Sequence, residues 1–127
     1  MSRGEIVAKD DYFVVAYKIL VYLYAVLKRE IVFDNETFKR TVKKDVVNED
    51  YFNDILYLMT EQGLISGLDF INVWGGNHVL VSDLSGARIT VAGISYLQDN
   101  DKMKRVGEIL KESADIIVSL AAKIIGL

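Results

Sequence analysis

The chain has 127 residues and contains neither cysteine nor proline, and His78 is its single histidine. The lack of thiols excludes disulfides, a thiolate nucleophile and a cysteine-ligated zinc site within this chain. One histidine is too few for the usual histidine-based catalytic or zinc sites, and no carboxylate pairs with a second reactive group in a recognisable pattern. We therefore expect a protein that acts by binding, with no enzymatic activity, cofactor or metal.

Basic residues are also relatively few. The 15 basic residues are outnumbered by 18 acidic ones, which gives a net charge of −3. A domain that binds DNA mainly through its phosphates tends to be basic. The average charge therefore does not favour a nucleic-acid partner, and the distribution of the basic side chains has to decide the question.

Hydrophobic residues are abundant, at 51% of the chain, and one stretch of them resembles a membrane segment. Residues 12–27 contain Lys18 as their only charge. The stretch is shorter than the roughly 20 residues that cross a bilayer, and a charge near its middle is costly in lipid. A buried helix over residues 10–29, capped by Asp10 or Asp11, explains the pattern better. We expect a cytoplasmic protein without a membrane partner.

Two further helices are predicted before the middle of the chain. Residues 34–45 form a short one, and residues 49–62 form another that begins after Asn48, a good N-cap residue. The second has apolar residues at i, i+3, i+4 and i+7, which predicts that its buried face consists of Phe52, Ile55, Leu56 and Met59.

The periodicity then changes. Residues 64–73 and 78–82 are rich in β-branched and aliphatic residues, and Gly75–Asn77 between them tolerate positive φ, so a tight hairpin is predicted. Residues 87–90 extend or join this small sheet. A short helix follows over residues 91–98, capped by Thr90, with Gly93 packed closely on the sheet. One long helix is predicted over residues 100–126.

This order of elements is that of a winged helix-turn-helix domain, in the α+β class and mainly α, with a two-stranded wing and a long C-terminal helix. Residues 1–98 form the winged-helix domain, and residues 99–127 form the C-terminal helix of the same domain. Other small α+β domains share the order, so the pattern alone leaves them open.

Three segments carry a resemblance to a known family: DYFVVAYKILVYLYAVLK, ITVAGISYLQDNDKMKR and LKESADIIVSL. They resemble the YjcQ family, whose members are small winged-helix-like proteins of Gram-positive bacteria and their prophages. The resemblance extends from about residue 10 to residue 120. It implies a winged-helix fold and a mobile-element origin, but it brings no catalytic residues and no established biochemical role.

The candidate nucleic-acid contacts are basic residues outside the presumed recognition helix. Helix 49–62 contains no base, and its outer face carries acids that repel phosphate. The phosphate candidates are Lys39, Arg40, Lys43 and Lys44 on helix 34–45, and Arg88 after the hairpin. Solubilising side chains, or partners of the acidic helix, are the alternative roles for this basic cluster.

The candidate partner surface comprises the outer face of helix 49–62 and the hairpin tip: Asp50, Asp54, Tyr57, Glu61, Trp74 and His78. For the last two the sequence favours a plainer role. We expect Trp74 to fold back onto the core and His78 to be an ordinary strand residue, rather than an exposed pair that inserts into a partner.

The C-terminal segment has apolar residues at alternating spacings of three and four, as in a coiled coil. This predicts a homodimer whose seam consists of Met103, Val106, Leu110, Ile117, Leu120 and Ile124. The alternative is that the same stripe packs along the chain's own first helix.

Two functions are therefore left open. One is a transcriptional regulator of phage or prophage origin that binds DNA weakly through helix 34–45. The other is a protein-interaction module that keeps the winged-helix scaffold without binding DNA.

Overall fold

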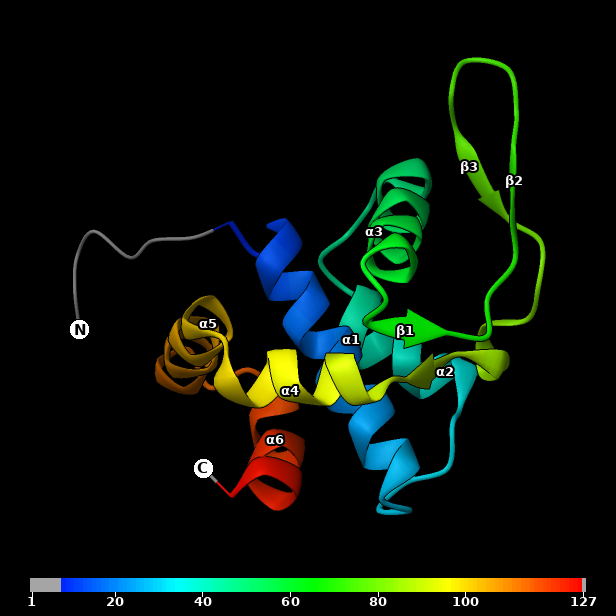
Figure 1. Ribbon diagram of the computed structural model, residues 1–127. Coiled ribbons are helices and arrows are strands. Elements are labelled where there is room, and N and C mark those ends of the chain that lie inside the picture. The colour runs from blue at the N-terminus through cyan, green and yellow to red at the C-terminus, as the bar shows by residue number, and fades with distance from the viewer. Residues whose placement is uncertain (1–7, 127) are drawn as a thin grey trace.

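The computed structural model describes residues 8–126 and has the predicted class, α+β and mainly α. Figure 1 shows the elements in chain order. They are α1 (Tyr12–Leu27), α2 (Asn35–Phe38), the π-helical turn η2 (Lys39–Lys43), α3 (Glu49–Glu61), β1 (Ile65–Ser66), β2 (Phe70–Asn72), β3 (His78–Leu80), the 3-10 turn η3 (Leu84–Gly86), β4 (Arg88–Ile89), α4 (Val91–Asp99), α5 (Asp101–Glu112) and α6 (Ile117–Ile125).

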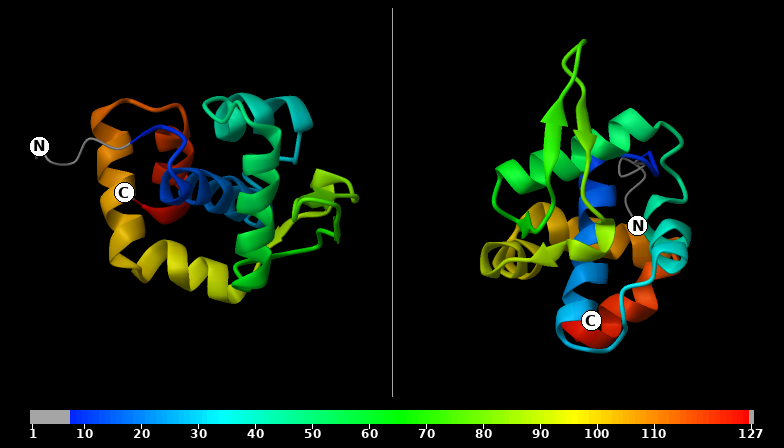
Figure 2. Two further views of the ribbon diagram at one scale, coloured as in Figure 1. Left: turned by 90° about the horizontal axis from the view of Figure 1, so that it is seen from above. Right: turned by 90° about the vertical axis from the view of Figure 1, so that its right-hand side faces the viewer.

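Helix α1 lies at the centre of the molecule, which confirms the prediction of a buried helix. Asp11 begins it by accepting a hydrogen bond from the backbone N–H of Phe13, at 3.0 Å. Every residue from 14 to 23 is buried. Helices α3, α4, α5 and α6 pack around it (Figure 2). No helix within residues 8–126 is long and apolar enough to cross a membrane.

The prediction of one continuous helix over residues 100–126 is wrong. Helix α5 ends at Glu112 and α6 begins at Ile117, and Ala114 between them has a left-handed backbone with φ of 56°. The turn brings the Asp115 side chain to the buried ammonium of Lys18, with 2.9 Å between Oδ2 and Nζ. The other carboxylate oxygen accepts the backbone N–H of Ile117 at 3.0 Å and so caps α6.

Because of this turn, the predicted dimer seam is used inside the chain. Five of its six residues are buried in the chain's own core: Met103, Val106, Leu110, Ile117 and Ile124. The sixth, Leu120, is half-buried. Helices α5 and α6 both pack on α1. The alternative left open by the sequence therefore accounts for the stripe, and a homodimer, which stays a prediction, would have to use another surface.

The predicted hairpin is confirmed. Strands β2 and β3 are antiparallel and pair Phe70 with Leu80, Ile71 with Val79 and Asn72 with His78. The turn includes Gly75 and Gly76, both with positive φ, as expected for Gly75–Asn77. The first part of the predicted strand 64–73 is separate, because β1 pairs with β4 instead. The prediction that residues 87–90 extend or join the hairpin's sheet is therefore wrong in part, because β4 forms a second two-stranded sheet with β1.

The start of α4 shows why the chain packs tightly beside β1 and β4. Thr90 caps the helix by accepting the N–H of Gly93 at 2.9 Å, as predicted. A Cβ atom on Gly93 would lie only 2.2 Å from the carbonyl oxygen of Leu64. Glycine at this position is therefore what permits the close approach.

We expect Leu110→Asp to destabilise the folded chain itself, and not merely to separate two copies. Leu110 is buried against α1, and an unpaired carboxylate there should lower the free energy of unfolding by at least about 3 kcal/mol. Ile116→Asp is the matched control, because Ile116 is half-exposed at the start of α6 and should change stability by less than about 0.5 kcal/mol. Urea denaturation with sedimentation velocity checks both. A Leu110→Asp protein that stays folded as a monomer with wild-type stability would contradict the internal role of the seam.

Candidate functional site

Helix α3 forms one wall of the candidate site, and its sequence fixes which face is outward. Asn48 caps the helix by accepting the backbone N–H of Tyr51 at 3.1 Å. The inward face is the predicted one, with all four residues buried: Phe52, Ile55, Leu56 and Met59. The opposite face carries the predicted partner-surface residues Asp50, Asp54, Tyr57 and Glu61.

The hairpin packs on this outer face of α3 through aromatic contacts. The His78 ring is stacked on the ring of Tyr57, with 3.6 Å between centroids and 11° between planes. Phe70 meets the same tyrosine edge-on at 5.6 Å. The Nδ1 atom of His78 lies 3.4 Å from Oδ1 of Asp54. His78 is thus a strand residue that anchors the hairpin, as the sequence favoured, and not a group at the tip.

These contacts divide the predicted acidic surface. Asp54 and Tyr57 are half-buried under the hairpin, whereas Asp50 and Glu61 are exposed. The four side chains therefore do not form a single open face that could enter a DNA groove. Three of the four, Asp50, Asp54 and Glu61, are acidic, and Tyr57 is the aromatic contact of the hairpin.

The outward side of the hairpin is apolar. Side chains alternate between the two faces of a strand, so the residues that do not face α3 point away from the molecule. They are half-exposed or partly exposed: Ile71, Val73, Val79 and Val81. We call these four residues, together with Trp74, the wing face. Sequence reasoning missed them because it looked for polar contacts, although the apolar residues at every second position, Ile71 and Val73, then Val79 and Val81, were a signal.

Trp74 at the tip is 99% exposed, so the expectation that it folds back onto the core is wrong. The hairpin projects beyond the helices and carries its tip away from the core (Figures 1 and 2). The bend at Val73–Gly76, closed by the Gly76 N–H donating to Val73 O at 3.2 Å, lies at this far end. A tryptophan at the end of a projecting hairpin has nothing within reach to cover it.

Charge around the wing face is negative. Residues 64–87 contain no lysine or arginine, while Asp69 and Asp83 are exposed at the base of the hairpin. At the start of α3, Asp50 is exposed, whereas Glu49 is paired with Lys43 and adds no net charge. The wing therefore offers apolar contact and negative potential together.

The predicted phosphate contacts are partly engaged within the chain, and two of them, Lys39 and Lys43, line a cavity together with Leu80 of the hairpin. Lys43 forms an ion pair with Glu49 and lies over the Phe52 ring, 5.7 Å from its centroid. Lys44 lies 4.0 Å from Asp115. Arg88 donates to two backbone carbonyls, those of Ser85 and Ala87, both at 3.0 Å.

On α2 and η2, Lys39 and Arg40 are exposed and form no ion pair with another of the described residues. No group of three or more histidine, aspartate or glutamate side chains in residues 8–126 is arranged to hold a metal ion.

Comparison with known proteins adds the family. The family model described as YjcQ protein matches residues 17–116. The chain belongs to the YjcQ family. The match runs from the middle of α1 to the turn before α6, so it includes α3, the hairpin and Asp115. No curated protein and no solved structure matches the chain.

We expect Tyr57→Ala to loosen the hairpin while leaving the core intact. The ring holds both His78 and Phe70, and such aromatic pairs contribute about 1 kcal/mol beyond the buried area. Backbone amides of the hairpin, such as that of Val81, which donates to Asp69 O at 2.9 Å, should exchange about tenfold faster in hydrogen exchange. Leu58→Ala, on the exposed side of the same helix, should leave these rates unchanged. Equal rates in Tyr57→Ala and the wild type would contradict the anchoring role.

Proposed function

We propose that this member of the YjcQ family acts by binding another protein through its wing face. The observation that carries the proposal is the fully exposed Trp74 at the tip of a hairpin whose outer side is apolar. Contiguous exposed apolar surface is uncommon in monomeric proteins and marks interaction sites. Tryptophan is also one of the residues that most often dominates binding energy at interfaces.

A winged-helix scaffold fits the order of the elements. Helix α2 with η2, then α3, then the hairpin β2–β3 follow one another in the order of the two helices and the wing of such a domain. The helix in the recognition position contains four acids, Glu49, Asp50, Asp54 and Glu61, and no base. Arg, Lys, Asn and Gln make most base contacts, and α3 has only Asn53 among them, while its acids repel phosphate. This argues for a protein partner over DNA.

The chemistry of the surface suggests the chemistry of the partner. Exposed Asp69 and Asp83 adjoin the apolar wing face along the chain, so a complementary segment has apolar side chains flanked by lysine or arginine. The apolar contacts supply the affinity, and the charges orient the partner. A second copy of this chain is a poorer match, because the same face of that copy is acidic as well.

DNA binding through α2 and η2 is the second candidate, and exposed Lys39 and Arg40 are the observation that favours it. With Lys43, Lys44 and Arg88 engaged within the chain, few phosphates can be neutralised. Binding would then be weak, independent of sequence and steeply dependent on salt.

A photo-crosslinking residue in place of Trp74 tests the proposal directly. Position 74 is fully exposed, so the substitution should not disturb the fold. In cells of the source organism we expect a covalent adduct with a different protein whose linked segment contains lysine or arginine beside apolar residues. The double substitution Ile71→Ser and Val81→Ser on the same background should reduce the adduct about tenfold or more.

The matched control is Lys39→Ala with Arg40→Ala, which removes the exposed bases and should leave the adduct unchanged. An adduct formed only with a second copy of the chain, or one insensitive to the wing-face substitutions, would contradict the proposal. So would tight binding of a short DNA duplex at about 50 mM salt that the Lys39→Ala and Arg40→Ala protein loses, because this result assigns the function to α2 and η2.

A further inference from the structure

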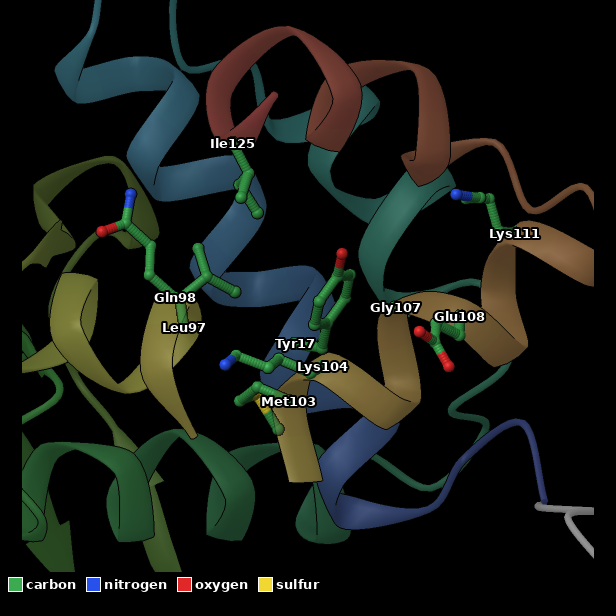
Figure 3. A pocket seen from close by; sticks show the side chains of 9 residues that line it. All are labelled: Tyr17, Leu97, Gln98, Met103, Lys104, Gly107, Glu108, Lys111 and Ile125. Carbon is green, nitrogen blue, oxygen red and sulfur yellow. The ribbon is translucent and has the colours of Figure 1, made fainter. Parts of the chain in front are cut away.

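A cavity of about 290 Å³ lies on the side of the molecule formed by α1, α4, α5 and α6, and it takes no part in the function proposed above. Figure 3 shows the side chains that line it. Its apolar walls are Leu97, Met103 and Ile125, which come from three different helices. The volume is at the lower end of the range for small-molecule sites.

Tyr17 of α1 places a polar group in this apolar cavity. Its side chain is 97% buried, since the residue is only 3% exposed, and the ring lies in the middle of the lining residues in Figure 3. Its hydroxyl makes no hydrogen bond with any of the residues 8–126. The neighbouring buried tyrosine, Tyr22, behaves differently, because its hydroxyl accepts the N–H of Asp34 at 3.2 Å and donates to the carbonyl oxygen of the same residue at 3.3 Å.

The hydroxyl oxygen is open to the cavity, so it can donate a hydrogen bond to a ligand there without giving up a partner in the protein. Burial raises the pKa of Tyr17 to about 12, which keeps the hydroxyl protonated at neutral pH. It is therefore available as a hydrogen-bond donor.

Gly107 of α5 keeps the hydroxyl accessible. A Cβ atom at this position would lie 2.9 Å from the Tyr17 hydroxyl oxygen, which is closer than a Cβ atom normally lies to any other heavy atom. Glycine inside a helix is unfavourable relative to alanine, and here the contact with Tyr17 explains its presence. The phenol and the glycine thus form the floor and one side of the same cavity.

The rim of the cavity is positive. Lys104, Glu108 and Lys111 occupy positions i, i+4 and i+7 of α5, so they share one face of the helix, and all three line the cavity. Two ammonium groups against one carboxylate leave one excess positive charge. Their exposure to solvent lets an anion reach them without a large desolvation cost.

We propose that this cavity binds a small carboxylate with an apolar body. One carboxylate oxygen accepts the hydrogen bond from the Tyr17 hydroxyl, the charge faces Lys104 and Lys111, and the apolar body packs against Leu97, Met103 and Ile125. The limited volume restricts the ligand to a single ring or a short chain.

Titration of the full chain with 3-phenylpropionate, hexanoate and butyrate, followed by amide chemical shifts in two-dimensional NMR, tests this inference. We expect saturable shifts for Gly107 and its neighbours in α5 at millimolar concentration or below for at least one of the three acids. The neutral amide of the same acid should bind more weakly. Absence of saturation for all three acids, or shifts centred elsewhere in the chain, would overturn the proposal.

Two tyrosine variants separate a binding role from a structural one. Tyr17→Phe removes a hydroxyl that has no partner, so the free protein should keep its melting temperature while its affinity for the acid falls about tenfold. Tyr22→Phe is the matched control: it loses hydrogen bonds to Asp34, so its melting temperature should fall while its affinity stays unchanged. Unaltered affinity in Tyr17→Phe, or an equal loss in Tyr22→Phe, would show that the hydroxyl does not contact the ligand.

Discussion

The buried ammonium group of Lys18 is the constraint on which much of the structure depends. It lies near the middle of the central helix, only 1% exposed, and an unpaired charge there would be strongly destabilising. Asp115 pairs with it at 2.9 Å and Asp45 at 3.6 Å. One carboxylate comes from the turn between α5 and α6, and the other follows η2, so the lysine ties three distant segments together. Oδ2 of Asp45 is the one buried side-chain polar atom in residues 8–126 that lacks a hydrogen bond.

The state of Asp115 agrees with this role. Burial opposes its ionisation, but the hydrogen bond from Ile117 and the ammonium groups of Lys18 and Lys44 outweigh burial and lower the pKa of Asp115. A carboxyl group whose pKa is lower in the folded chain than in the unfolded chain stabilises the fold above its unfolded pKa. That contribution is lost as the pH falls through the pKa of the folded state. The turn is therefore held by a charge that is present at neutral pH.

Much of this arrangement could be predicted from local sequence. The N-caps at Asp11, Asn48 and Thr90, the apolar spacing of α3 and the glycine-containing hairpin turn are all decided by residues within a few positions of one another. The break before α6 could not be predicted in this way, because residues 113–116 contain no glycine or proline. The reason for the break is a lysine almost one hundred positions earlier in the chain.

In the candidate site, too, the features that depend on residues far apart in the chain could not be predicted. A repeat of apolar residues looks the same whether it packs on another copy or on the chain's own α1, so the predicted seam could not reveal its partner. The exposure of Trp74 depends on how far the hairpin projects, which no local pattern encodes. The cavity around Tyr17 and Gly107 joins residues ninety positions apart, and nothing near either residue marks it.

A double-mutant cycle on Lys18 and Asp115 is the most direct test of this account. Lys18→Met keeps the length of the side chain without its charge, and Asp115→Asn keeps an acceptor for the N–H of Ile117. Each single variant leaves a buried charge with fewer partners, whereas the double variant removes both. Urea denaturation at neutral pH should show that the double variant loses less stability than the sum of the two singles, by about 2 kcal/mol. Losses that add to within about 0.5 kcal/mol would show that the pair does not hold the turn between α5 and α6.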